Sequence, residues 1–264
     1  MSLDFGLKDV HVLITGAAGG IGLEAVRTFQ QLGARVTAHY NSKIGELATV
    51  EGIVTIQADV RDETSVNTLL SKAAQQNGGP VSCLVVNHGI WPSNNTPIVD
   101  MELSQWQNTM AVDLNGPFLL VKAYLKALRA ASQSSRDAVS NSVIFVGSTA
   151  GKFGEANHGD YSAAKSALMY GLTVTLKNEI VSIAPQGRVN TISPGWVATP
   201  MAMETLKDKA FVERALATTP LQKVATPADI ARQLAVIASP TLSGHVNGQN
   251  IMVDGVGHTA GKDI

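Results

Sequence analysis

Short, wholly apolar segments alternate with longer stretches of helical periodicity along almost the whole chain. Apolar residues at helical spacing mark residues 21–32, 62–76, 104–131 and 161–183. The seven apolar segments that we predict as strands are residues 10–14, 35–39, 53–56, 83–86, 143–146, 188–192 and 249–253. Strands that are apolar throughout and separated by helices predict a parallel sheet with helices on both faces. The alternation therefore predicts an α/β, doubly wound fold with a seven-stranded parallel sheet, in which ligands bind beyond the carboxyl ends of the strands.

The length and composition are those of a globular protein with one core. The chain has 264 residues, of which 45% are hydrophobic and 16% are charged, and this balance excludes a disordered chain. No internal repeat or linker divides the sequence, so we predict a single domain spanning residues 1–264. Residues 199–220 interrupt the alternation of strands and helices. We interpret residues 196–220 as a lid over the binding site, built on an inserted helical segment.

Charge and cysteine content exclude several classes of function. The net charge is −1 and no run of Lys or Arg occurs, which argues against nucleic-acid and membrane-surface partners. Cys83 is the single cysteine and lies in an apolar segment, so we expect a core residue and no internal disulfide. No apolar run reaches the roughly 18–20 residues of a spanning helix, and residues 1–8 lack the pattern of a signal peptide. We expect a cytoplasmic protein without a metal site.

A glycine-rich loop joins the first predicted strand to the first predicted helix. Its glycines allow a tight turn and let backbone N–H groups approach a pyrophosphate at a helix N-terminus. The position after the strand favours the register Gly16-x-x-x-Gly20-x-Gly22 over one that starts inside the helix at Gly20. The loop predicts a dinucleotide site on a Rossmann-like fold. A tight turn without a ligand is the alternative.

Further motifs follow the loop in a fixed order and spacing. Asp59-Val60, Asn87-His88-Gly89 and Ser148 follow the third, fourth and fifth predicted strands, Tyr161-Ser162-Ala163-Ala164-Lys165 opens a long helix, and Ser193-Pro194-Gly195 precedes Val197 and Thr199. This ordered set resembles the short-chain dehydrogenase/reductase family over almost the whole chain, and the C-terminal half is similar to 3-oxoacyl-ACP reductases among others. The resemblance implies a nicotinamide cofactor and hydride transfer. It implies cofactor contacts from Gly16, Ala18, Gly20, Ile21, Gly22, Asp59, Val60, Asn87, Gly89, Tyr161, Lys165, Pro194, Gly195, Val197 and Thr199.

Tyr161 and Lys165 lie four residues apart, so a helix places both side chains on one face. A tyrosine hydroxyl has an unperturbed pKa of about 10, and a nearby ammonium lowers that pKa. We predict that Tyr161 exchanges a proton with the substrate oxygen and that Ser148 hydrogen-bonds the same oxygen. The resemblance implies that Lys165 also binds the ribose hydroxyls of the nicotinamide nucleotide.

The sequence departs from the family's pattern at two positions. The family places an asparagine three residues before a glycine in a long helix, where it perturbs the helix and holds a water on a proton relay to the lysine. Here Asp113 precedes Gly116 at that interval. We hypothesise that Asp113 occupies the relay position and alters the pH dependence; a helix aspartate without a catalytic role is the alternative. His88 replaces the family's usual alanine, and we expect packing or hydrogen bonding from it.

Cofactor preference and substrate class are predicted from single positions. No carboxylate ends the second predicted strand, where NAD-binding relatives usually carry one, and the segment Tyr40-Asn41-Ser42-Lys43 offers hydrogen bonds and a charge to a 2′-phosphate. We therefore predict NADP(H) as the preferred cofactor, with NAD(H) possible. The residues that we expect to bound the substrate pocket are Trp91, Phe153, His158, Trp196 and Met201. They favour an uncharged ketone or secondary alcohol, because no arginine is placed to clamp an anion.

The resulting hypothesis is an NADPH-dependent carbonyl reductase, and two alternatives stay open. One is a cofactor-binding regulatory protein without turnover, which Asp113 alone favours. The other is a non-redox lyase on the same fold, whose members lose the glycine loop and the lysine that this chain keeps. The resemblance also implies a homo-oligomer, a dimer or tetramer, and the apolar residues 114–128 and 163–176 allow such an interface.

Overall fold

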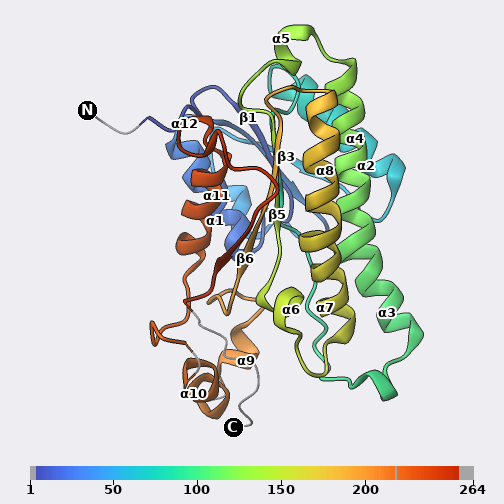
Figure 1. Ribbon diagram of the computed structural model, residues 1–264, viewed down its shortest axis with the longest axis vertical. Coiled ribbons are helices and arrows are strands. Elements are labelled where there is room, and N and C mark those ends of the chain that lie inside the picture. Colours follow the sequence, from blue (N-terminus) through green and yellow to red (C-terminus); the bar gives the residue numbers. More distant parts are fainter. Residues whose placement is uncertain (1–3, 208, 218, 256–264) are drawn as a thin grey trace.

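The structure is a computed structural model that describes residues 4–207, 209–217 and 219–255. A seven-stranded sheet runs through its middle (Figure 1). The strands are β1 (His11–Ile14), β2 (Arg35–Tyr40), β3 (Val54–Gln57), β4 (Cys83–Val86), β5 (Ser142–Val146), β6 (Arg188–Pro194) and β7 (Asn250–Val253). Their order is β3-β2-β1-β4-β5-β6-β7, and every neighbouring pair is parallel. The predicted doubly wound fold is confirmed.

Helices cover both faces of the sheet (Figure 1). On one face lie α1 (Gly20–Gln31), α11 (Pro227–Ala238) and the short α12 (Pro240–Ser243); on the other lie α2 (Glu63–Gln76), α4 (Gly116–Ala130) and α8 (Thr173–Glu179). Because successive strand residues point to opposite faces, the central strands β1, β4, β5 and β6 contribute to both cores. Val12 and Cys83 pack in the core that contains α1 and α11, whereas Leu13 and Leu84 pack in the core that contains α2, α4 and α8.

The two predicted long helices each contain a π-helical turn. The first runs from α3 (Leu103–Met110) through the π-turn η3 (Ala111–Asn115) into α4, and the second from α7 (Gly159–Ser166) through the π-turn η4 (Ala167–Leu172) into α8 and the 3₁₀ turn η5 (Ile180–Ser182). A π-turn holds one residue more than the α-turn that it replaces and leaves a local break in the hydrogen-bond ladder. The first π-turn contains Asp113.

Short elements complete the described part of the chain. Two of them, α9 (Met203–Lys207) and α10 (Lys209–Ala217), form the predicted inserted helical segment, and α5 (Gln133–Arg136) lies in the connection between α4 and β5. The others are α6 (Thr149–Phe153), η1 (Gly45–Thr49) and η2 (Ile98–Asp100). No helix among the described residues is long and apolar enough to cross a bilayer.

The strand order fixes where a ligand site forms. From β1 the chain winds outward to β3 on one side, and from β4 it winds outward to β7 on the other. The loops that follow β1 and β4 therefore leave the sheet in opposite directions and open a crevice at the carboxyl ends of these strands.

Candidate active site

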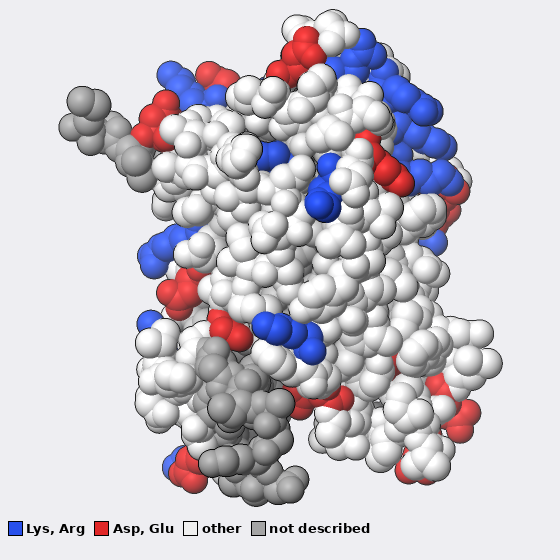
Figure 2. Space-filling model, viewed as in Figure 1, with Lys and Arg blue, Asp and Glu red and all other residues white. Residues whose placement is uncertain are grey.

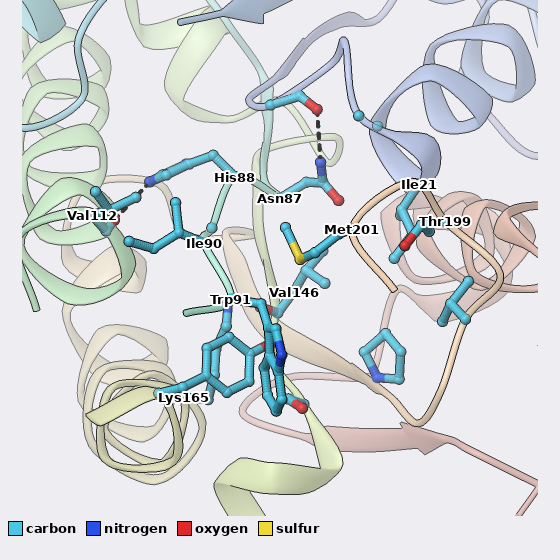
Figure 3. Close-up of a pocket in the computed structure, with 18 of the residues that line it drawn as sticks. Ile21, Asn87, His88, Ile90, Trp91, Val112, Val146, Lys165, Thr199 and Met201 are labelled. Carbon is cyan, nitrogen blue, oxygen red and sulfur yellow. Dashed lines mark hydrogen bonds between the residues drawn. The ribbon is translucent and has the colours of Figure 1, made fainter. Parts of the chain in front are cut away.

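A cavity of about 530 Å³ occupies the crevice, and loops that follow six of the strands line it. Figure 3 shows how Asn87, Lys165 and Thr199 approach it from three different elements. The predicted site residues found in its lining are Gly16, Gly20, Ile21, Gly22, Asn41, Asp59, Val60, Asn87, Gly89, Trp91, Ser148, Tyr161, Lys165, Pro194, Gly195, Trp196, Val197, Thr199 and Met201. The structure thus brings together the residues of seven separate sequence motifs.

The glycine loop is built so tightly that side chains are excluded at its key positions. Gly16 has a φ of +63°, and a Cβ there would lie 2.8 Å from the Cα of His88. A Cβ on Gly22 would lie 2.2 Å from the Gly16 carbonyl oxygen, and one on Gly20 would lie 2.9 Å from the Thr199 Cγ2. These distances are below van der Waals contact, so the backbone between β1 and α1 is left bare toward the cavity.

Asn87 and His39 hold this loop in place. The Asn87 side-chain amide donates to the carbonyl oxygens of Thr15 (3.0 Å) and Gly16 (3.2 Å). His39 is buried, its Nδ1 accepts from the Gly16 N–H (3.3 Å), and its Nε2 donates to the Ala58 carbonyl (3.1 Å). Burial lowers the pKa of His39, so the neutral tautomer supplies both bonds. Sequence reasoning missed His39, which lies within a strand and outside every motif.

Tyr161 and Lys165 project from α7 toward Ser148 at the start of α6. The Lys165 Nζ lies 5.5 Å from the centre of the Tyr161 ring. The Ser148 hydroxyl accepts from the Ala150 N–H (3.2 Å), and it favours the ionised form of Tyr161. Burial raises the pKa of Tyr161, and it outweighs the lowering by the Lys165 ammonium and the Ser148 hydroxyl. Lys165 therefore acts on the tyrosine pKa in the predicted direction.

Asp113 lies behind the cavity wall, against Lys165. It is fully buried, and its Oδ1 accepts from the Ile90 N–H (2.8 Å). Its Oδ2 lies 3.9 Å from the Lys165 Nζ and accepts no hydrogen bond within the described chain. The Lys165 Nζ in turn donates to the Val146 carbonyl (3.1 Å). Burial raises the pKa of Asp113 to about 6, although Lys165 and the Ile90 N–H favour its charged form.

His88 bridges the glycine loop and the π-turn that carries Asp113. Its Nδ1 accepts from the Thr15 hydroxyl (2.8 Å), and its Nε2 donates to the Val112 carbonyl (3.2 Å), a bond drawn in Figure 3. Burial, with His39 and Lys165 adding to it, lowers the pKa of His88 to about 3. The ring is therefore neutral at physiological pH, in line with the hydrogen-bonding role that we predicted.

Aromatic rings surround the substrate end of the cavity. The Trp91 ring stacks on His158 with 3.8 Å between centroids, and it lies edge-on to Tyr161 (4.8 Å) and Trp196 (5.9 Å). The His158 Nε2 hydrogen-bonds the Pro92 carbonyl (3.2 Å). His158 thus supports Trp91 from behind, and Trp91 presents the wall next to the tyrosine.

Some predicted residues lie outside the lining, and some lining residues were not predicted. Asp113, Ala18, Tyr40, Ser42, Lys43, Phe153 and His158 are described residues that do not line the cavity, and their predicted contacts stay predictions. Besides His39, the lining includes Arg61, Asn108 and Glu155. Arg61 forms an ion pair with Asp59 (2.7 Å). It stands directly after the Asp59-Val60 motif, which was the one available signal for it.

The sequence was compared with known families and proteins. The pattern of the family described as enoyl-(acyl carrier protein) reductase matches residues 16–258. Cis-4-hydroxycyclohexanecarboxylate dehydrogenase from Sinomonas cyclohexanicum is 31% identical, over 94% of this chain and 96% of its own. The chain belongs to the short-chain dehydrogenase/reductase family. This short-chain dehydrogenase/reductase is thus an oxidoreductase that acts on CH–OH or carbonyl groups.

Other relatives match over a similar length of the chain, but their names specify different substrates. L-Rhamnose 1-dehydrogenase (NAD(P)(+)) from Azotobacter vinelandii is 30% identical over 94% of this chain and 96% of its own. The 3-oxoacyl-[acyl-carrier-protein] reductase of Synechocystis sp. is 30% identical over 92% and 94%. A crystal structure of a short-chain dehydrogenase/reductase, glucose/ribitol dehydrogenase, from Brucella melitensis superposes with a TM-score of 0.83 at 30% identity, over 96% of this chain and 98% of that one. The family is common to these relatives, whereas the substrate is not.

Proposed function

We propose that this protein is an NADPH-dependent carbonyl reductase that acts on an uncharged ketone and, in reverse, on the corresponding secondary alcohol. The observation that carries the proposal is the meeting of Ser148, Tyr161 and Lys165 at one end of a cavity whose other end is a bare glycine loop. At the first end, Tyr161 can exchange a proton with a substrate. At the other end, the glycine loop offers space and backbone N–H groups for a dinucleotide pyrophosphate.

The residues present fit a nicotinamide dinucleotide. Glycines at positions 16, 20 and 22 let the loop fold so tightly that a Cβ would collide with the protein itself. The loop lines the cavity at the start of α1, and Asn87 fixes it from behind. Once bound, the cofactor would supply or accept the hydride. Tyr161 would then exchange a proton with the substrate oxygen, and the Ser148 hydroxyl would orient that oxygen by a hydrogen bond. The Lys165 ammonium would favour the phenolate that forms.

Asp113 is proposed as a positioning residue that acts through Lys165. Its free Oδ2 faces the Lys165 Nζ at 3.9 Å, so its charge adds to the field at the lysine and, through it, at Tyr161. If Asp113→Asn left the pH profile of kcat/KM unchanged, this role would be ruled out. A helix aspartate without influence on the reaction would give that result.

The preference for NADPH is proposed on the charges at the adenosine end. Asn41 lines the cavity beyond β2 in place of a carboxylate, and the nearby Asp59 is engaged by Arg61. Arg61 is also the guanidinium closest in the lining to that end, and it can contact a 2′-phosphate. The test is kcat/KM for NADPH and NADH. We expect a preference of at least about tenfold for NADPH, reduced by Arg61→Ala more than by Lys43→Ala, and a preference for NADH would contradict the proposal.

A substrate panel separates the reductase from its main rival. The protein is mixed with NADPH and one ketone at a time, and oxidation of NADPH is measured as the loss of its nicotinamide absorbance. Oxidation of NADPH that depends on the ketone and is lost in Tyr161→Phe supports the reductase. Tight binding of NADPH without oxidation by any ketone would instead favour a regulatory protein, the reading that the buried carboxylate Asp113 suggests.

A homo-oligomer is proposed on the exposed apolar side chains of α4, η4, α8 and η5. The middle of the face shown in Figure 2, around α8, carries few charged side chains. The exposed apolar residues on these elements are Phe118, Tyr170, Val174 and Val181. Light scattering after size exclusion would give the mass of a dimer or tetramer. A monomer at micromolar concentration would contradict the proposal. The cytoplasmic location and the lid at residues 196–220 stay predictions.

A further inference from the structure

One charged side chain in the cavity lining has no ion-pair partner among the described residues. Four lining residues of the described chain carry charge: Asp59, Arg61, Glu155 and Lys165. Arg61 pairs with Asp59 at 2.7 Å, and Lys165 faces Asp113 at 3.9 Å. Glu155 has no ion-pair partner among the described residues. The Glu155 carboxylate is therefore the charge in the lining that no described ion pair offsets.

Glu155 is fixed beside the catalytic helix. It follows Gly154, which ends α6 with a φ of +79°, and its backbone N–H donates to the Ser162 hydroxyl (3.0 Å), the residue after Tyr161. Its carbonyl accepts from the His158 N–H (3.1 Å), just before α7 begins. These bonds hold the main chain, while the carboxylate has no hydrogen bond within the described part of the chain. Partial burial raises the pKa of Glu155, which fits a charge with little water around it.

His158 is a basic group that acts on the Glu155 carboxylate, but its ring nitrogens lie against backbone carbonyls of other residues. The charge of His158 opposes the rise in the Glu155 pKa. However, the two ring nitrogens of His158 lie 3.3 Å from the Ala156 carbonyl and 3.2 Å from the Pro92 carbonyl, and its ring face is covered by Trp91. His158 forms no ion pair with Glu155 among the described residues, so it acts on the carboxylate without a direct bond.

A desolvated carboxylate among aromatic rings is suited to a cation. Trp91 and Trp196 line the same cavity as Glu155, with the two indoles 5.9 Å apart and edge-on. Aromatic faces attract ammonium groups, and a carboxylate adds charge attraction. A substrate carboxylate would meet the repulsion of Glu155 instead. A neutral substrate would meet neither effect.

We propose that Glu155 selects substrates by charge, favouring ketones and alcohols that carry a protonated amine and disfavouring those that carry a carboxylate. The inference rests on the reductase function proposed above and changes its substrate class: the preferred ketone carries an ammonium group elsewhere in the molecule, in place of a wholly uncharged ketone. It sets this chain apart from a relative whose name specifies a hydroxycyclohexanecarboxylate. Glu155 acts here as a specificity residue, because the proton transfer is left to Tyr161.

The test compares compounds that differ only in charge. The ketones are 4-aminocyclohexanone, 4-oxocyclohexanecarboxamide and 4-oxocyclohexanecarboxylate, assayed with NADPH at pH 7.5 in low salt. Cyclohexylammonium and cyclohexanecarboxylate are titrated against the NADPH-bound protein by tryptophan fluorescence, so that binding is measured without turnover. We expect wild type to favour the ammonium over the carboxylate by at least about tenfold in binding, because charges at close range in a partly buried site interact strongly.

The matched variant is Glu155→Gln, which keeps size and removes charge. It should bring the ammonium-to-carboxylate ratio to within about threefold and leave kcat/KM for the carboxamide unchanged within the same factor. Glu102→Gln, on an exposed residue outside the cavity lining, should leave the ratio as in wild type. A wild-type ratio near one, or a ratio that survives Glu155→Gln, would overturn the inference. Oxidation of NADPH by none of the ketones would instead count against the reductase, while the binding ratio would still decide on Glu155.

Discussion

Replacing Asp113 by asparagine removes a buried ionisable group without changing the size of the side chain. Asp113 is fully buried, and burial raises its pKa from 3.8 to about 6. Because the folded-state pKa lies above the unfolded value, the native protein binds this proton more tightly than the unfolded chain does. Stability is therefore lost as the pH rises from about 4 to about 6, and the loss stays constant at higher pH. An amide does not titrate, so Asp113→Asn should be more stable than wild type above pH 6.

The size of the effect follows from the two pKa values. A difference of about 2 pKa units corresponds to about 3 kcal/mol of unfolding free energy once the carboxylate is ionised in both states. The same linkage gives about 1.6 kcal/mol near pH 5 and about 0.5 kcal/mol near pH 4. For a chain of this length, about 3 kcal/mol corresponds to a rise of several degrees in Tm.

Urea unfolding of both proteins at intervals between pH 4.5 and 7.5 measures this difference. Asp160→Asn is the matched control, because Asp160 is equally buried but accepts hydrogen bonds from Thr109 (2.7 Å), Gln105 (3.2 Å) and the Tyr161 N–H (2.9 Å). An amide oxygen and nitrogen cannot accept all three, so this variant should lose stability at every pH. A stability gain for Asp113→Asn that is the same at pH 5 and at pH 7.5 would refute the reasoning.

Three further predictions concern the cofactor loop, the tyrosine and the buried histidine. In Gly22→Ala the new Cβ would lie 2.2 Å from the Gly16 carbonyl oxygen, so NADPH binding should weaken at least about tenfold in a calorimetric titration. In Gly19→Ala the Cβ would lie 3.4 Å from the same oxygen, and NADPH should bind as in wild type. Tyr161→Phe should lower kcat by about 10²–10⁴-fold and change the NADPH Kd by less than about threefold; a coupled loss of both would point to misfolding. His88→Leu removes the hydrogen bonds to the Thr15 hydroxyl and the Val112 carbonyl, and Thr15 keeps other partners. The variant should lose about 1–3 kcal/mol in urea unfolding, so an equally stable variant would contradict the bridging role of His88.

Strands were predictable in this chain because a sheet covered on both faces demands apolar residues at every position. The predicted strand at residues 83–86 coincides with β4, and the one at 53–56 is shifted by one residue from β3. The π-turns were not predictable, because their residues keep the apolar spacing of the helices around them. Residues 104–131 and 161–183 therefore read as two unbroken helices.

Site residues could be predicted where they belong to a sequence motif. Isolated site residues outside every motif could not be predicted. The spacing of their residues identifies the glycine loop and the Tyr161–Lys165 pair in the sequence, and both line the cavity. Glu155 lies in a loop between two helices with no pattern around it, and His39 reads as part of a strand. Conversely, Ser42 and Lys43 follow β2 as expected but stand exposed outside the cavity lining, because the direction of a side chain at the end of a strand depends on the turn that follows.

Because Asp113 lies in the π-turn at Ala111–Asn115, the orientation of its carboxylate can change without a change in the rest of the fold. Deleting one residue from it would convert it to an α-turn and leave both α3 and α4 continuous with their neighbours. Such a deletion would keep the register of both flanking helices and change the direction of Asp113 relative to Lys165. A change of one residue in the length of this turn would therefore decide whether the carboxylate faces the lysine. Helices in this position can gain or lose an active-site residue by a change in length, while the sheet beneath them stays the same.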